Sequence, residues 1–114
     1  MISKATAAHY TWGDGCDGWR LVQSAGLSVI HERMPPRTAE VRHYHRTARQ
    51  FFFILSGSAI MECGDERVAL CAGEGLEVAP GVPHRILNEE EHDIEFLVVS
   101  VPPTAGDRVS GDER

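Results

Sequence analysis

Two histidines separated by one residue, His43 and His45, form the pattern with the clearest chemical meaning in this sequence. On a β-strand, residues i and i+2 share a face, so the two imidazoles can converge on one metal ion while Tyr44 points to the other face. Because pairs at this spacing also arise by chance, the hypothesis of a metal site needs support from other positions.

A second group of residues lies downstream of this pair. Gln50 follows His45 by five residues, and Gly57 follows Gln50 by seven. A turn rich in glycine and proline, residues 73–83, then leads to His84. Turns of this composition reverse the chain sharply, so His84 is expected at the start of a strand.

Read together, the two blocks resemble the two motifs of the cupin superfamily, and the chain looks like a small single-domain cupin. The positions that match are His43, His45 and Gly57 in the first motif, and Gly73, Gly81, His84 and Asn88 in the second. The positions that depart are Arg37 for the leading glycine, Gln50 for the usual glutamate, and Ala79 for a proline. The resemblance covers about residues 27–101, and the joint match is far more specific than either motif alone.

The resemblance implies an all-β fold, a double-stranded β-helix or jelly-roll β-barrel, with a divalent transition metal held inside one end. Carried over position by position, the ligands would be His43, His45, His84 and Gln50. Iron, manganese, nickel and zinc all suit such a site, so the metal stays open. The alternative is that the site has lost its metal and these are satisfied polar residues at the mouth of a barrel.

The substitution at Gln50 changes the charge of the implied site. Three neutral imidazoles and a neutral amide leave the +2 charge of a divalent ion uncompensated, whereas a carboxylate would reduce it to +1. We therefore expect weaker metal binding but stronger Lewis acidity. Gln50 either coordinates through its carbonyl oxygen or hydrogen-bonds a metal-bound water, and the sequence does not separate these.

Other candidate residues are less specific. His31 is a catalytic candidate that could face the cavity as an acid or base, although a lone strand histidine is more often exposed or simply hydrogen-bonded. The arginines near the first motif, Arg33, Arg37 and Arg42, could attract an anionic substrate, although single arginines at strand ends are usually solvated. No motif for an organic cofactor is present.

The elements that must position these residues are short strands between regularly spaced turns. The segments rich in β-branched, aromatic or alternating apolar residues are 19–24, 27–34, 50–56, 58–63, 67–71, 75–79, 84–88 and 94–101. This spacing predicts an antiparallel sandwich or small barrel. We expect one domain over residues 1–114, with a core at about 27–101 and a loose polar tail at 104–114.

The run from Phe51 to Leu55 is apolar at every position, so a strand here has two apolar faces. Either an N-terminal segment of the same chain or a second subunit must cover the outer face. We expect a homodimer, with a monomer as the alternative.

Composition excludes several classes of protein. Seventeen acidic against eleven basic residues give a net charge of −6, which disfavours nucleic acid as a partner. No apolar run is long enough to span a membrane, and the start of the chain does not read as a secretory signal. Three cysteines without a C-x-x-C pair indicate free thiols, and we expect a cytoplasmic protein.

The functional hypothesis is a metal-binding cupin that acts on or binds a small oxyanionic or enolisable molecule. If it is an enzyme, the resemblance places an iron dioxygenase first and an isomerase or lyase second. The rival is a non-catalytic sensor or sugar-binding module. An acid, base or arginine that points into the cavity would favour catalysis, and a wholly apolar lining would favour binding.

Overall fold

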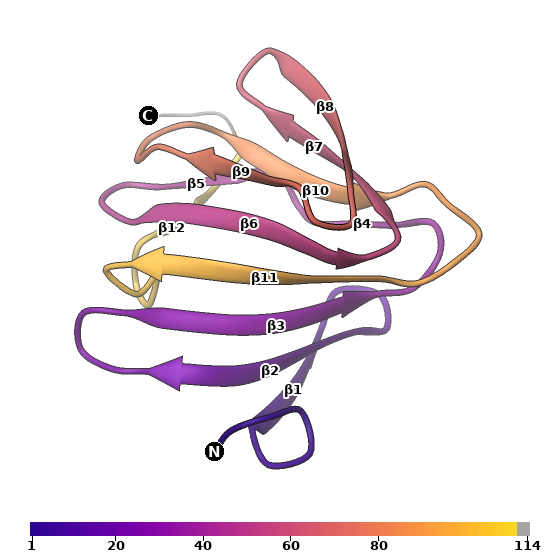
Figure 1. The fold of residues 1–114 in the computed structure, drawn as a ribbon. Helices are drawn as coiled ribbons and strands as arrows, with labels where there is room; N and C mark the ends of the chain where they lie inside the picture. The colour runs from indigo at the N-terminus through magenta and orange to yellow at the C-terminus, as the bar shows by residue number, and fades with distance from the viewer. Residues whose placement is uncertain (112–114) are drawn as a thin grey trace.

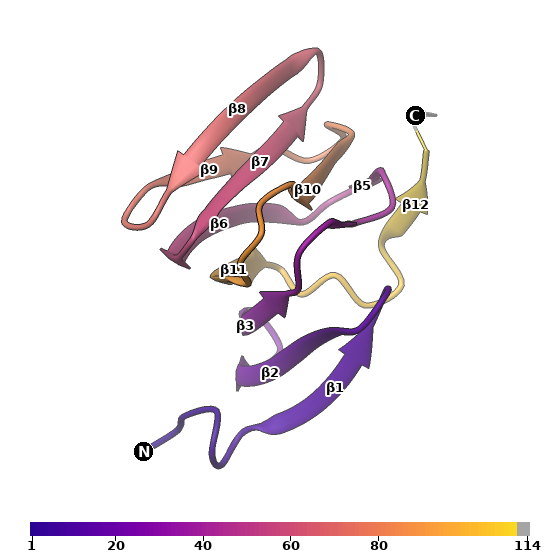
Figure 2. The same ribbon diagram turned by 90° about the vertical axis from the view of Figure 1, so that its right-hand side faces the viewer.

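The computed structural model describes residues 1–111, which form two antiparallel sheets and contain no helix. The first sheet has the order β1 (Ala8–Trp12), β2 (Cys16–Gln23), β3 (Ser28–Met34), β11 (Ile94–Val101), β6 (Arg49–Ser56) and β9 (Gly75–Val78). The second has the order β12 (Arg108–Ser110), β5 (His43–His45), β10 (His84–Asn88), β7 (Ser58–Cys63) and β8 (Glu66–Cys71), with β4 (Thr38–Ala39) also paired to β10. Figures 1 and 2 show the two layers face to face. The predicted all-β architecture is confirmed.

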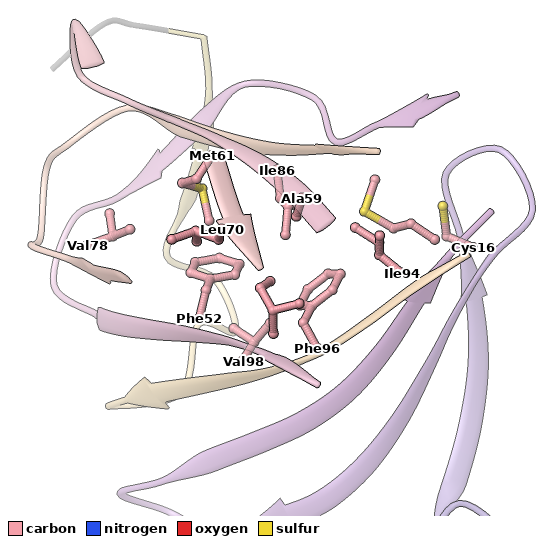
Figure 3. Packing of buried hydrophobic residues seen from close by; sticks show 12 residues of the cluster. Cys16, Phe52, Ala59, Met61, Leu70, Val78, Ile86, Ile94, Phe96 and Val98 are labelled. Atoms are coloured by element: carbon pink, nitrogen blue, oxygen red, sulfur yellow. The ribbon is translucent and has the colours of Figure 1, made fainter. Parts of the chain in front are cut away.

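The core lies between the sheets, where the alternation of each strand directs its apolar residues inward. On β6, Phe52 and Ile54 are buried while their neighbours Phe51 and Leu55 face outward. These inward side chains pack against residues from β7, β10 and β11, including Met61, Ile86 and Phe96 (Figure 3). Burying each such side chain stabilises the fold by about 1.5–3 kcal/mol. The apolar contacts fix the distance between the sheets and therefore the frame that carries the site.

All eight predicted strands are present. Seven have bounds within one residue of the prediction, and the first begins at Cys16 rather than at residue 19. Strand β5 is absent from those eight segments and was indicated only by the spacing of His43 and His45. Strands β1, β4 and β12 were not predicted, because they are short and their apolar residues do not alternate clearly. No helix in residues 1–111 has the length and apolarity needed to cross a membrane.

The prediction of a loose tail at residues 104–114 is wrong for residues 108–110, which form a strand. Residues 108–110 form β12, which pairs with β5 from Arg108 opposite His45 to Ser110 opposite His43. Asp107 secures this segment, because its carboxylate accepts hydrogen bonds from the backbone N–H groups of Thr47 and Ala48. A polar strand of three residues gives no hydrophobic signal in the sequence, so only its pairing reveals it. Residues 112–114 of the predicted tail lie outside the described residues.

The outer face of β6 is apolar, as the sequence indicated. Phe51 is 41% exposed and Leu55 is 40% exposed, and the ring of Phe51 lies 6.1 Å from that of Phe53. The N-terminal strand β1 does not cover them, because it pairs with β2 at the opposite edge of the sheet (Figure 1).

Candidate metal centre

Three buried histidines from two neighbouring strands meet at one end of the barrel. His43 and His45 come from β5, and His84 comes from β10, where it is the register partner of His43. One ring nitrogen of each histidine lies within 4.8 Å of the corresponding nitrogen of the other two. The strand pairing thus brings the two histidine blocks of the sequence together, as their spacing predicted, and the three side chains can hold one metal ion.

The turn before His84 is tied directly to β5. Gly81 has a φ of 82°, in the left-handed region that glycine adopts without strain. Its N–H donates a hydrogen bond of 2.7 Å to the carbonyl oxygen of His45. The turn therefore fixes where β10 begins relative to β5.

Backbone carbonyls set the tautomers of two of the histidines. Nδ1 of His43 lies 2.7 Å from the carbonyl oxygen of Val41, and Nδ1 of His84 lies 2.9 Å from that of Val82. Because a carbonyl oxygen only accepts, each Nδ1 carries the proton and each Nε2 presents a lone pair. Carbonyl contacts of this kind orient metal-binding histidines.

Burial keeps the three imidazoles neutral. It lowers the pKa of His43 to about 3 and that of His45 to about 4, and it also lowers the pKa of His84. Nδ1 of His45 is the one buried side-chain nitrogen or oxygen in residues 1–111 without a hydrogen-bond partner. A buried polar atom without a partner is unfavourable, and a nearby cation would satisfy it.

Gln50 completes this group from the other sheet. Its register partner on β11 is Ser100, and its amide nitrogen donates to Oγ of Ser100 at 3.1 Å. That bond turns Oε1 of Gln50 towards Nε2 of His84, at 3.0 Å. Nε2 of neutral His84 presents a lone pair towards this side-chain amide. Two atoms that bind one ion at right angles, each at about 2.1 Å, lie about 3.0 Å apart, so the spacing fits a shared metal ion.

His43, His45 and Gln50 line a cavity of about 260 Å³ that also contains acidic and basic groups. Its polar lining includes Tyr10, Glu32, Glu40 and Arg108, and its apolar lining includes Trp12, Ile30, Phe52 and Val98. Oε2 of Glu40 lies 3.9 Å from Nε2 of His43. Burial raises the pKa of Glu32 to about 7 and that of Glu40 to about 8, and the charge of Glu32 adds to the shift at Glu40.

Comparison with known proteins identifies the family. Residues 30–100 match the family model of the cupin domain. The chain belongs to the cupin family. Its barrel is therefore the double-stranded β-helix of the cupins, in agreement with the resemblance noted in the sequence.

Individual similar proteins are distant in sequence. An uncharacterized protein of Methanocaldococcus jannaschii is 27% identical over 76 residues, which is 67% of this chain and 61% of the relative. A predicted oxalate decarboxylase of Thermotoga maritima has a TM-score of 0.83 at 18% identity, covering 90% of this chain and 99% of that one. A sugar phosphate isomerase of Silicibacter pomeroyi, from the cupin superfamily, has a TM-score of 0.79 at 19% identity, covering 90% and 76%. At these identities the likeness shows the fold alone.

The cupin motif positions outside the ligand set have structural roles here. A Cβ at Gly57 would lie 2.8 Å from Cγ2 of Ile94, and the side-chain amide of Asn88 donates to the carbonyl oxygens of Met34 and His92. Arg37, in place of the leading glycine, has a φ of 58° and is the one non-glycine residue of the described chain in the left-handed region. A glycine would adopt this backbone conformation without strain.

The weaker sequence candidates lie away from the cavity of this cupin. His31 is on the outer face of β3, where Nε2 lies 2.7 Å from Oε1 of Glu95 and the ring packs on Trp19. Arg33 donates to Asp17 and Asp93, and Arg37 pairs with Glu91 at the surface.

Arg42 also lies outside the cavity, since it donates to the carbonyl oxygen of Gly64 in a separate surface pocket. The cationic side chain that does line the cavity is Arg108 on β12.

The sequence reasoning did not identify Tyr10, Glu32, Glu40 or Arg108. One signal was available in the sequence. Ile30 and Met34 are apolar residues on the inward face of β3, and residues two apart on a strand share a face, so Glu32 also faces inward. No local pattern places the other three, because β1, β4 and β12 are brought to the cavity only by long-range strand pairing.

Proposed function

We propose that this cupin binds one divalent transition-metal ion through His43, His45, His84 and Gln50, and that it acts on a small oxyanionic or enolisable molecule in the adjoining cavity. The observation that carries the proposal is the meeting of three buried histidines, each with a ring nitrogen within 4.8 Å of a ring nitrogen of the other two. The unpartnered Nδ1 of His45 supports it independently.

The bound ion would supply Lewis-acid polarisation of a ligand oxygen, with its +2 charge uncompensated by Gln50. The chain supplies the other parts. Arg108 adds a fixed positive charge at the cavity and would attract an anionic group. Trp12, Phe52 and Val98 line the same space with apolar surface and limit the access of water. The volume of about 260 Å³ suits a small molecule rather than a polymer.

The composition of the cavity favours an isomerase or lyase. Both reactions need a group that takes up or returns a proton, and the cavity contains the carboxyl groups of Glu32 and Glu40. One similar structure is named a predicted oxalate decarboxylase and another a sugar phosphate isomerase. Both names refer to anionic substrates, which agrees with this choice at the level of the fold.

An iron dioxygenase, the first expectation from the sequence, is the second candidate. The set of three neutral imidazoles supports it, because nitrogen ligands suit iron. A non-catalytic binding module is less favoured, because its cavity would need no carboxyl groups of raised pKa.

A cytoplasmic location is also proposed. All three cysteines are free thiols, as a reducing compartment maintains them.

Crystals of the protein soaked in manganese test the metal site directly, because anomalous diffraction locates the ion without assumptions about its ligands. We expect one peak, with a ring nitrogen of each of His43, His45 and His84 and Oε1 of Gln50 within about 2.0–2.3 Å. The Gln50→Leu protein is the matched control and should bind the ion with the histidines alone. A peak elsewhere, or His43 or His84 turned outward, would contradict the proposal.

A further inference from the structure

Three residues lie in one row across the first three strands of the molecule. In the strand register Tyr10 on β1 is opposite Gly18 on β2, and Gly18 is in turn opposite Glu32 on β3. Figure 2 shows these strands side by side at one edge of the sheet. The hydroxyl of Tyr10 crosses the middle strand and donates a hydrogen bond of 3.0 Å to Oε2 of Glu32.

This contact depends on the glycine between the two side chains. A Cβ at Gly18 would lie 2.2 Å from Cζ of Tyr10 and 2.5 Å from its hydroxyl oxygen. Any side chain at residue 18 would therefore displace the tyrosine ring. The row Tyr10–Gly18–Glu32 is thus a specific arrangement that holds one oxygen of a carboxyl group inside the cavity.

The groups that face Glu32 come from several elements. Tyr10 donates from β1, Arg20 on β2 lies over the Tyr10 ring at 4.6 Å, and Arg108 reaches the cavity from β12. The positive charges of Arg108 and Arg20 and the Tyr10 hydrogen bond lower the pKa of Glu32, but burial outweighs them and holds it at about 7. Glu40 is the other carboxyl group of this cavity. Near neutral pH, Glu32 can therefore both accept and release a proton.

We propose that Glu32 is the proton-transferring residue of the cavity, acting on a carbon next to the carbonyl group of a small 2-oxo acid, and that Tyr10 is its positioning residue. The proposal deepens the proposed function and rests on it for the ligand. Glu32, His43 and His45 line the same cavity, so a molecule bound beside these histidines shares that space with the carboxyl group.

The step is balanced without any oxidant or reductant. Ionised Glu32 takes the proton, the carbon–hydrogen bond breaks, and its electron pair forms a carbon–carbon double bond. The carbonyl π pair moves onto the carbonyl oxygen, whose new negative charge is favoured by the cationic surroundings. Return of the proton from Glu32 to carbon completes an exchange or an isomerisation. Tyr10 holds Oε2 throughout, which leaves Oε1 to exchange the proton.

The first test is a carbon-13 NMR titration of the glutamate carboxyl groups in metal-free protein. We expect one resonance with a midpoint near 7 that is missing from Glu32→Gln. Tyr10→Phe should move that midpoint upward, because it removes a hydrogen bond that stabilises the ionised form of Glu32. Gly18→Ala should shift it in the same direction, whereas Gly26→Ala, at a position with open space, should not. A midpoint unchanged by Tyr10→Phe would contradict the positioning role.

The second test is deuterium uptake into pyruvate in heavy water, catalysed by zinc-loaded protein. General acid–base catalysis contributes about 10²–10⁴-fold, so Glu32→Gln should slow uptake by about 100-fold or more. Pyruvate affinity, measured by calorimetry, should stay within about twofold, and Glu90→Gln in an exposed turn should match the wild type in both measurements.

The outcomes separate the two proposals. Wild-type protein that binds zinc and pyruvate but exchanges no faster than free zinc would overturn the role of Glu32 and leave the metal site standing. Equal rates in wild type and Glu32→Gln would do the same. Failure to bind zinc at all would instead contradict the proposed function, and the proposal for Glu32 would fall with it.

Discussion

Oε1 of Gln50 on β6 and Nε2 of His84 on β10 lie 3.0 Å apart, so the site joins the two sheets. If both atoms are ligands of one ion, Gln50→Glu should tighten metal retention, because an anionic oxygen attracts the cation more strongly than an amide dipole does. The same change should weaken the binding of an anionic ligand, because the net charge of the site falls by one. Competition with a chelator measures the first quantity, and titration with pyruvate measures the second.

Gln50→Leu is the control, because it removes the amide oxygen of Gln50 without adding a negative charge. It should release metal more readily than the wild type. If Gln50→Glu changes neither quantity, Gln50 does not contact the ion or its bound water, and the ligand set reduces to the three histidines.

Arg37 provides a test of the backbone at the position where cupins usually have glycine. Its φ of 58° is strained for a residue with a Cβ atom and unstrained for glycine. We expect Arg37→Gly to raise the free energy of unfolding by about 0.5–1 kcal/mol, measured by urea denaturation. The ion pair with Glu91 is exposed at both ends, so its loss has little effect. Arg37→Ala removes the same ion pair but keeps the strain, and equal stability of the two variants would contradict this explanation.

Glu32 should give the stability of the metal-free protein a defined dependence on pH. Its pKa is 4.5 in the unfolded chain and about 7 in the folded protein, so the folded state binds its proton more tightly. The resulting stabilisation is complete below pH 4.5 and is lost as the pH rises through 7. Relative to wild type, Glu32→Gln should therefore gain stability between pH 4.5 and 8, by up to about 3 kcal/mol.

Urea unfolding of both proteins at pH 4.5 and at pH 8 measures this difference, and the histidines cancel because both proteins contain them. Glu90→Gln serves as the surface control. A difference between Glu32→Gln and wild type that does not vary with pH would show that the carboxyl group titrates normally.

The apolar outer face of β6 leads to a prediction about assembly. We propose that a second copy of this chain covers it, because Phe51 and Phe53 lie beside Val99 and Leu97 of β11 to form a continuous apolar surface. Analytical ultracentrifugation should show a dimer at micromolar concentration, and Phe51→Lys should shift it towards monomer. Val41→Lys, at an exposed position outside this face, should leave the dimer intact. A wild-type monomer at that concentration would contradict the proposal.

The His43–His45 pair could be predicted from local spacing, whereas His84 was added to it through the resemblance to the cupin motifs. The spacing of His43 and His45 places both on one face of a strand, and the turn at Gly81 delivers His84 beside them. The pairing of β10 with β5 places His84 beside His43, because the two residues are register partners. Residue types and spacing that define a strand face are readable without knowledge of the fold.

The remainder of the cavity could not be predicted in the same way. Arg108 lies on β12, a strand of three residues with no hydrophobic pattern in the sequence. Glu40 directly follows β4, a strand of two residues. His31 was considered because it lies on the strand that precedes the first motif, but its position in the alternation of β3 directs it outward to Glu95. Glu32, the next residue in that alternation, has the inward position. The alternation of inward and outward positions along the strand thus predicted which residues line the cavity better than residue type did.

Metal content per chain tests the central claim most directly. Protein purified without a metal-affinity tag, reconstituted with zinc and freed of unbound ions, is measured by elemental analysis beside His45→Ala. His9→Ala is the surface control, because His9 pairs with Asp17 away from the site. The account predicts about one ion per chain in wild type and His9→Ala, and less than about a tenth of that in His45→Ala. Wild-type protein without metal, or His45→Ala with unchanged metal, would contradict it.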